Sequence, residues 1–226
     1  MADLAGEAGV VADVGTDHGY IPVFLVSCGK AGRAIAMDVN EGPLRRAEEN
    51  IRQFGLEGRI ETRLSDGLHA LTPGEAEVIV IAGMGGALMA RILEEGEEAA
   101  RAAGRLTLQP QSELPAFRRF LSERGYRITD EDMVSEDGKF YAMMEAEWAG
   151  HGSAGSCREL TEAEMKYGAL LIARRNPVLH SYLLRQREQK QEILEKLGKN
   201  ARQDVSGRKE QLKLELGEIE AMLGSW

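Results

Sequence analysis

"VADVGTDHGYIP", residues 11–22, carries an apolar run into a turn of small and polar residues. The run favours a buried strand, and Gly15 and Gly19 permit a tight turn that leads into a helix. A strand that passes through glycines into a helix is typical of nucleotide-binding sheets. The dinucleotide fingerprint G-x-G-x-x-G is absent, however, because T-D-H separates the two glycines.

The polar residues of this turn indicate which kind of nucleotide it binds. A carboxylate at Asp17 would repel a pyrophosphate, whereas a nucleoside with a cationic group would be attracted. S-adenosylmethionine has an ammonium and a sulfonium, so Asp13 or Asp17 could bind its amino group while helix-start amides bind its carboxylate. Asp17 could equally cap the helix, and His18 could be a turn or wall residue.

The first 150 residues alternate β-rich runs with helical patterns, which predicts a parallel, doubly wound α/β sheet. The expected strands are residues 10–15, 33–38, 60–66, 77–83 and 105–110. Gly55 and Gly125 stand where helices should end. Residues 126–148 leave no room for a helix, and Asp137-Gly138 is a hairpin signal. An antiparallel pair that closes a parallel sheet favours a seven-stranded, Rossmann-like methyltransferase domain over a dehydrogenase.

After residue 150 the pattern becomes helical. Residues 149–156 read as a linker between a methyltransferase domain at 1–150 and a helical domain at 157–226. One helix should begin at the capping box of Thr161 and Glu164 and pause near Asn176, since Pro177 follows. Two longer amphipathic helices, joined by a turn at 200–207, should pair as a coiled-coil hairpin. Their expected apolar positions are Leu179, Leu183, Ile193, Leu194 and Leu197, then Leu212, Leu216, Ile219 and Leu223.

Charge and cysteine content narrow the function classes. The net charge is −9, but residues 157–226 carry +2, and the stretch 166–187 has five basic residues and no acidic one. Arginines near His180 and Tyr182 in "RRNPVLHSYLLRQR" suit an RNA backbone and a splayed base, although a solvated helix face would look similar. The two cysteines show no metal or disulfide pattern, and no signal peptide or roughly 20-residue apolar run occurs. We therefore expect a cytoplasmic protein without membrane segment or metal.

Acidic residues at two further strand ends suit the rest of the cofactor. Asp38 lies 23 residues after Gly15, where a carboxylate can accept hydrogen bonds from both ribose hydroxyls. Asp66, in "SDGL", can accept a hydrogen bond from the exocyclic amine of an adenine, although Asp-Gly is also a common turn. Both residues have ordinary surface or turn roles as alternatives.

"VIAGMGGALM", residues 80–89, places three glycines in four positions at the end of a strand. The Asn/Asp-Pro-Pro-Tyr/Phe motif of methyltransferases that modify exocyclic amines is absent, and the bare backbone leaves room for a base plane. Tight helix–strand packing is the alternative. At the neighbouring strand end, Gln109 could read a base edge, and Tyr141 could stack on a base or belong to the core.

These stretches together resemble the bacterial tRNA (adenine-22-N1)-methyltransferase family, the TrmK type. The matching pieces are "VADVGTDHGYIP", "DVNEGPLRRAEENI", "DGL", "IAGMGG", "LQP" with "FLSERGY", and "EDGKFY". The resemblance implies transfer of a methyl group from S-adenosylmethionine to N1 of adenine 22, in the D-loop region of tRNA. It also implies a C-terminal coiled coil. Relatives usually carry an N-terminal helical segment before the first strand, and often Asn at the position of Gln111.

The expected sites follow from the motifs and the resemblance together. The catalytic residues are Asp17, Gly83 and Met84. The cofactor residues are Asp13, Gly15, Thr16, Asp17, His18, Gly19, Asp38, Val39, Asp66, Gly67, Ala82 and Gly83. The substrate residues are Gly85, Gly86, Gln109, Pro110, Tyr141, Arg174, Arg175 and Arg185. We expect a monomer or weak dimer that binds tRNA; a methyltransferase for another base or a small molecule, and a non-catalytic RNA-binding protein with a nucleoside pocket, are the alternatives.

Overall fold

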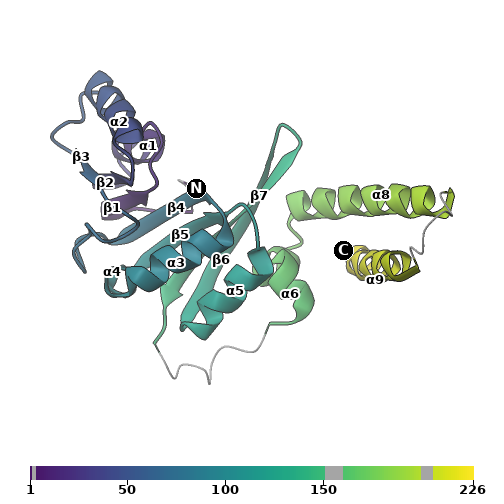
Figure 1. The fold of residues 1–226 in the computed structure, drawn as a ribbon. Helices are drawn as coiled ribbons and strands as arrows, with labels where there is room; N and C mark the ends of the chain where they lie inside the picture. Colours follow the sequence, from purple (N-terminus) through teal and green to yellow (C-terminus); the bar gives the residue numbers. More distant parts are fainter. Residues whose placement is uncertain (2–3, 151–159, 200–205) are drawn as a thin grey trace. The chain divides into compact units, whose positions relative to one another are not determined.

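The computed structural model describes residues 1, 4–150, 160–199 and 206–226 (Figure 1). Most of the expected linker at 149–156 and of the expected turn at 200–207 lies outside the described residues, as does Cys157. The chain divides into two compact units, described separately below. Unit 1 comprises residues 1–132 and 141–159, and unit 2 comprises residues 133–140 and 160–226.

The described strands form a seven-stranded sheet in the order β3-β2-β1-β4-β5-β7-β6. Their bounds are β1 Ala8–Val14, β2 Ala31–Asp38, β3 Ile60–Leu64, β4 Val78–Met84, β5 Arg105–Pro110, β6 Tyr126–Glu136 and β7 Lys139–Trp148. The first five strands pair in parallel, and β7 runs antiparallel to β5. The predicted parallel sheet with a closing antiparallel hairpin is therefore confirmed.

A two-residue turn joins β6 to β7. Asp137 has φ 48° and Gly138 has φ 71°, so both central residues are left-handed. That geometry matches the right-handed twist of the flanking strands, which is why Asp-Gly favours such hairpins.

Helices cover both faces of the sheet (Figure 1). They are α1 Tyr20–Ser27, α2 Glu41–Gln53, α3 Gly86–Glu95, α4 Glu97–Ala102 and α5 Leu114–Glu123. Neighbouring residues of β4 point to opposite cores: Ile79 and Ile81 pack with α3, α4 and α5, whereas Val78 and Val80 pack with α1 and α2. A strand buried on both faces must be apolar at every position, which explains the continuous run in the sequence.

Unit 2 contains α6 Glu162–Tyr167, α7 Ala169–Ala173, α8 Pro177–Lys199 and α9 Ser206–Gly224. The capping box of Thr161 and Glu164 is confirmed. The prediction of one helix from there to Asn176 is wrong, because Gly168 adopts φ 94° and separates α6 from α7. A left-handed glycine ends the helical hydrogen-bond pattern at low conformational cost.

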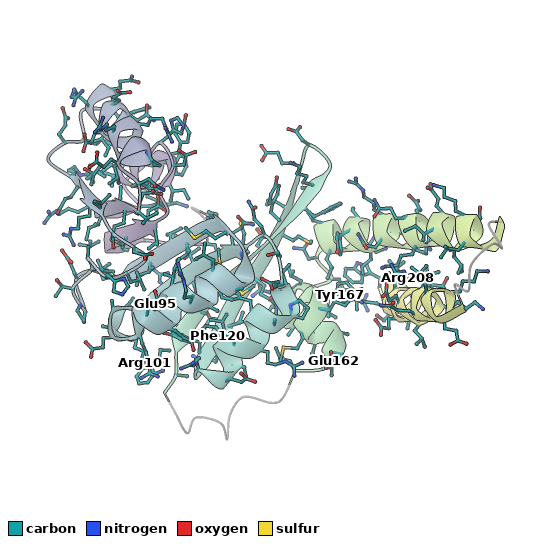
Figure 2. The ribbon with its side chains drawn as sticks, viewed as in Figure 1. Glu95, Arg101, Phe120, Glu162, Tyr167 and Arg208 are labelled. Atoms are coloured by element: carbon teal, nitrogen blue, oxygen red, sulfur yellow. The ribbon has the colours of Figure 1, made fainter. Side chains whose placement is uncertain are left out.

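The two long helices α8 and α9 pack antiparallel. Leu179 and Leu183 near the start of α8 share a core with Ile219 and Met222 near the end of α9. Tyr167 from α6 joins this core (Figure 2). The expected apolar position Ile193 is instead 41% exposed, beyond that core along α8.

Candidate active site

The turn after β1 is held by the neighbouring strand. The backbone N–H groups of Gly15 and Thr16 both donate to the carbonyl oxygen of Met37, at 2.8 Å each. A phosphate-binding loop needs such amides free to face the anion. Because β2 already uses these two, the turn is poorly suited to a pyrophosphate, in agreement with the sequence interpretation.

Two carboxylates lie at the carboxyl ends of adjacent strands. Asp13 on β1 is 4% exposed, and its burial, with a smaller contribution from the charge of Asp38, raises its pKa to about 6. Asp38 ends β2, is half-buried, and accepts a hydrogen bond from the N–H of Asn40 at 2.7 Å. A buried carboxylate with a raised pKa is stabilised by a cationic partner. This pair therefore suits a ligand that combines an ammonium with a diol.

Asp17 makes an ion pair rather than a helix cap. One of its carboxylate oxygens lies 3.0 Å from Nη2 of Arg46 on α2 and 3.6 Å from Nε2 of His18. The N-cap of α1 is Gly19, and no side chain caps that helix end. The alternative that Asp17 caps the helix is therefore wrong. The side chain is 70% exposed, so a ligand at the turn can reach it.

The rest of the turn is closely packed. Thr16 and Gly19 are buried, and His18 is half-buried with φ 59°. A Cβ atom at Gly19 would lie 3.1 Å from Cβ of Ala47 on α2, so α1 and α2 approach closely at this glycine. The second half of the loop is thereby fixed to α2.

The expected cofactor residues Val39, Asp66 and Gly67 lie at the edge formed by β2 and β3. Val39 follows β2 and is 57% exposed. Asp66, just after β3, is exposed, and its carboxylate lies 3.9 Å from Nη2 of Arg91. Gly67 has φ 56°, a conformation that favours glycine. These residues are thus open to a ligand.

The glycines at the end of β4 and the start of α3 serve different purposes. Gly83 is exposed with φ 78°, and a Cβ atom on it would come no closer than 3.8 Å to Nε2 of Gln111. Gly86 is buried, and a Cβ atom on it would lie 2.7 Å from the carbonyl oxygen of Ser112. Gly85 is looser, since the corresponding contact with the Ser112 hydroxyl is 3.1 Å. Tight packing explains Gly86, whereas Gly83 keeps the backbone bare.

Met84 brings the β4 segment onto the cofactor turn. A Cβ atom at Gly15 would collide with Cε of Met84, and Gly15 also has φ 75°. The positive φ favours glycine at position 15, and a side chain there would also displace the flexible end of Met84, which covers the bare Cα. Ala82, just before Gly83, is half-buried at the same strand end.

The side chain of Gln109 on β5 is hydrogen-bonded to the backbone of Gly83 on β4. That side chain is 7% exposed, and its Oε1 accepts a hydrogen bond from the N–H of Gly83 at 2.9 Å. Among the described residues, nothing accepts from its buried Nε2. Pro110 is also buried, and Tyr141 is half-buried. The structure thus gives Gln109 a role in positioning Gly83, which the sequence analysis did not anticipate.

Two residues of α2 were also missed by the sequence reasoning. Arg46 holds Asp17, and Nδ2 of Asn50 donates to the carbonyl oxygen of His18 at 2.8 Å. Both lie four residues apart on the helix that follows Asp38, so helical spacing alone places them on one face. Only the tertiary packing of α2 against the turn reveals what they contact.

The expected RNA contacts of the C-terminal part belong to unit 2. Arg174 and Arg175 are exposed, and Arg175 has φ 50°. Arg185 donates to the carbonyl oxygen of Gly138 at the hairpin tip, and its guanidinium lies 5.8 Å from the ring centre of Phe140. Arg185 is therefore partly engaged within its own unit.

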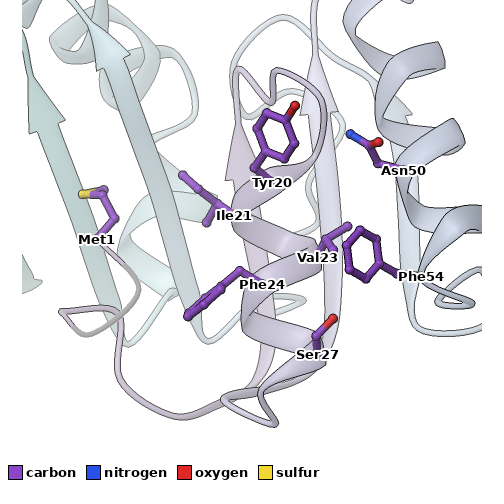
Figure 3. A pocket seen from close by; sticks show the side chains of 8 residues that line it. All are labelled: Met1, Tyr20, Ile21, Val23, Phe24, Ser27, Asn50 and Phe54. Atoms are coloured by element: carbon purple, nitrogen blue, oxygen red, sulfur yellow. The ribbon is translucent and has the colours of Figure 1, made fainter.

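An apolar cavity of about 560 Å³ lies along α1 and α2 (Figure 3). It is lined by Met1, Tyr20, Ile21, Val23, Phe24, Ser27, Asn50 and Phe54.

None of the helices in the described ranges combines the length and hydrophobicity that a membrane crossing requires. The same ranges hold no group of three His, Cys, Asp or Glu side chains arranged for a metal ion.

Comparison with known proteins identifies the family. Residues 11–220 match the model of the TrmK family, described as tRNA (adenine(22)-N(1))-methyltransferase. The tRNA (adenine(22)-N(1))-methyltransferase of Bacillus subtilis is 36% identical over 213 residues, which cover 94% of this chain and 88% of the relative. The crystal structure of the B. subtilis m1A22 tRNA methyltransferase TrmK has a TM-score of 0.79 at 33% identity, covering 98% of this chain and 95% of that one.

A structure of Streptococcus pneumoniae Sp1610 in complex with S-adenosyl-L-methionine has a TM-score of 0.84 at 32% identity, over 98% of this chain and 95% of that one. The turn after β1 and the glycine segment, residues 83–86, both lie within the residues that the family model matches. This chain belongs to the tRNA (adenine(22)-N(1))-methyltransferase family.

Proposed function

We propose that unit 1 carries out the family reaction at the carboxyl ends of β1, β2 and β4, on N1 of adenine 22 of tRNA. The observation that carries this assignment is the turn after β1. The N–H groups of Gly15 and Thr16 at its start both donate to the carbonyl oxygen of Met37. The carboxylates of Asp13 and Asp38 flank the turn. That donor set fits S-adenosylmethionine, which has an ammonium, a sulfonium and a ribose diol but no phosphate.

Each cofactor residue then has a distinct role. Asp13 faces the ammonium, and Asp38 accepts hydrogen bonds from the two ribose hydroxyls. Asp66 and Val39 bind the adenine ring of the cofactor, the first by its exocyclic amine and the second by apolar contact. Gly15 allows the turn to adopt φ 75°, a conformation that favours glycine.

The transfer itself asks for alignment more than for side-chain chemistry. Bound S-adenosylmethionine supplies a methyl group on a positively charged sulfur. N1 of the adenine attacks this methyl group with its lone pair, and the sulfur keeps the electron pair of the bond that breaks. Gly83 and Met84 hold the base in line and exclude water. The methylated ring is cationic, so the carboxylate of Asp17 stabilises it or takes up an N6 proton. Arg46 holds that carboxylate in place but also competes for it.

Unit 2 binds the phosphate backbone of the tRNA in this proposal. Arg174 and Arg175 are exposed cations in a stretch of 22 residues, 166–187, that carries no acidic side chain. Such a stretch attracts phosphates despite the negative net charge of the chain. We further propose that the protein works in the cytoplasm as a monomer or weak dimer, which sedimentation of the purified chain would test.

Methyl transfer to unmodified tRNA transcripts, with labelled S-adenosylmethionine and mapping of the modified position, tests the proposal. The expected product is 1-methyladenine at position 22. Replacement of adenine 22 by guanine in the transcript should abolish the label. Transfer to no adenine, or to a different one, would contradict the assignment.

A further inference from the structure

Two aromatic rings form a stacked pair at the start of α1. The ring centres of His18 and Tyr20 are 5.2 Å apart, and their planes differ by 9°. Tyr20 is 66% exposed, although large aromatic side chains usually bury most of their surface. The stack therefore leaves much of the Tyr20 ring available to a ligand.

Contacts from α2 fix the position of this pair. His18 has φ 59°, an uncommon conformation for a residue with a side chain, and Asn50 holds its carbonyl oxygen at 2.8 Å. Its ring also lies 3.6 Å from the Asp17 carboxylate, which Arg46 binds at 3.0 Å. Backbone strain of this kind persists only where surrounding contacts enforce it, and it concentrates at functional sites.

The pair also lies at the functional edge of the sheet. Tyr20 is the first residue of α1 and follows the cofactor turn directly, so it lies at the carboxyl end of β1. Ligands of open α/β sheets bind at that edge. Figure 3 shows Tyr20 in the first turn of α1, with Phe24 one turn further along and Asn50 on the neighbouring helix.

We propose that the exposed Tyr20 ring, backed by His18, is the platform on which the target adenine stacks for methyl transfer. An adenine drawn out of a folded RNA loses its stacking neighbours, and an aromatic side chain replaces them. Stacking on a rigid pair also fixes the plane of the base, so N1 stays in line with the methyl group. The inference rests on the proposed function and adds a substrate contact to it.

Three variants separate stacking from packing. Tyr20→Phe keeps the ring, and Tyr20→Leu keeps apolar bulk without a flat face. Phe24→Leu is the matched control, because Phe24 is 54% exposed on the same helix but is not part of the stacked pair. Calorimetry with S-adenosylmethionine and thermal unfolding of each variant report whether the cofactor turn is intact.

Methylation kinetics give the first readout. Loss of one base–aromatic stack lowers kcat/KM by about 5- to 150-fold, the equivalent of 1–3 kcal/mol. We expect that loss in Tyr20→Leu, and less than about threefold change in Tyr20→Phe and Phe24→Leu, with cofactor affinity unchanged in all three. Equal losses in Tyr20→Leu and Phe24→Leu, or wild-type kcat/KM in Tyr20→Leu, would overturn the stacking role.

A fluorescent base gives a second readout that does not depend on turnover. A tRNA with 2-aminopurine at position 22 is quenched by stacking in the folded RNA. It should stay quenched when the wild-type chain and S-adenosylhomocysteine bind, and become brighter when Tyr20→Leu binds. Equal fluorescence with both proteins would reject the platform. If the probe separates the two proteins in this way but the wild-type chain methylates no adenine, the proposed function fails and the stacking site stands.

Discussion

Arg118 on α5 and Glu131 on β6 form an ion pair with Nη2 and Oε1 2.9 Å apart, and each side chain is only 1% exposed. A buried pair of this kind makes a small net contribution to stability, but its rupture leaves an uncompensated charge. The pair fixes α5 against β6, and both residues belong to unit 1.

Arg118→Met should therefore lower the free energy of unfolding by about 3–5 kcal/mol, whereas the double variant Arg118→Met/Glu131→Leu should lose much less. Urea unfolding of the single and double variants measures both. Arg45→Ala, which breaks an exposed pair with Glu41, is the control and should change stability by less than about 1 kcal/mol. A double variant as unstable as the single one would contradict the explanation.

Asp38→Asn should weaken binding of S-adenosylmethionine by about tenfold or more. The amide keeps an oxygen for the N–H of Asn40 but loses the charge that strengthens hydrogen bonds from ribose hydroxyls. Calorimetry measures the dissociation constant. Glu57→Gln, at an exposed position before β3, controls for the change in net charge. An affinity within twofold of wild type would remove Asp38 from the ribose site.

The seven-stranded sheet was predictable because short-range physics sets its strands and its hairpin turn. The apolar run of β4 must be buried on both faces, and the Asp137-Gly138 turn favours one type of hairpin. The placement of Asp13 and Asp38 at one edge of the sheet follows from the same logic, since parallel strands bring their carboxyl ends together. These features need no knowledge of which helix packs where.

Long-range side-chain contacts could not be predicted from local patterns. The pairing of Asp17 with Arg46 depends on the packing of α2 against the turn, 29 residues away in sequence. The burial of Gln109 and its bond to Gly83 depend on the alignment of β4 with β5. The break between α6 and α7 at Gly168 was also not predictable, because a glycine inside a helical pattern can either continue the helix or end it.

Asp13 should make stability and cofactor binding respond to pH in opposite directions. Its folded pKa, about 6, lies above the ordinary value of 3.8, so the folded chain retains a proton that the unfolded chain has released between about pH 4 and 6. Stability from this group is therefore greatest below pH 4 and falls as pH rises to about 6. The loss amounts to roughly 3 kcal/mol. In the proposed site the ionised form of Asp13 binds the ammonium, so cofactor affinity should rise over the same window.

Comparison of wild type with Asp13→Asn isolates this group from other titrations. The variant should be more stable than wild type at pH 7.5, by urea unfolding without cofactor, and its cofactor affinity should vary less between pH 5 and 7.5. Equal pH slopes of affinity in the two proteins would show that another group accounts for the dependence.

Arg174→Ala/Arg175→Ala should weaken tRNA binding without changing cofactor affinity. If each arginine neutralises one phosphate, the slope of log K against log salt should fall by roughly one for each residue removed. Filter binding at several salt concentrations measures the slope. Arg208→Ala is the control, because Arg208 is exposed on α9 outside the acid-free stretch (Figure 2). An unchanged slope in the double variant would show that Arg174 and Arg175 do not bind tRNA phosphates.

Gly15→Ala should damage the cofactor turn in two separable ways. Alanine is strained at φ 75°, which costs about 1 kcal/mol or more, and its Cβ collides with Cε of Met84. Gly29→Ala supplies the control for strain alone, since Gly29 has φ 77° and no atom within 4 Å of the added Cβ. We expect Gly15→Ala to lower both unfolding free energy and cofactor affinity, and Gly29→Ala to lower only the first. Adding Met84→Ala removes the collision but leaves the strain, so a double-mutant cycle should show partial rescue of stability. Strict additivity of Gly15→Ala and Met84→Ala would mean that Met84 moves aside freely and does not constrain the turn.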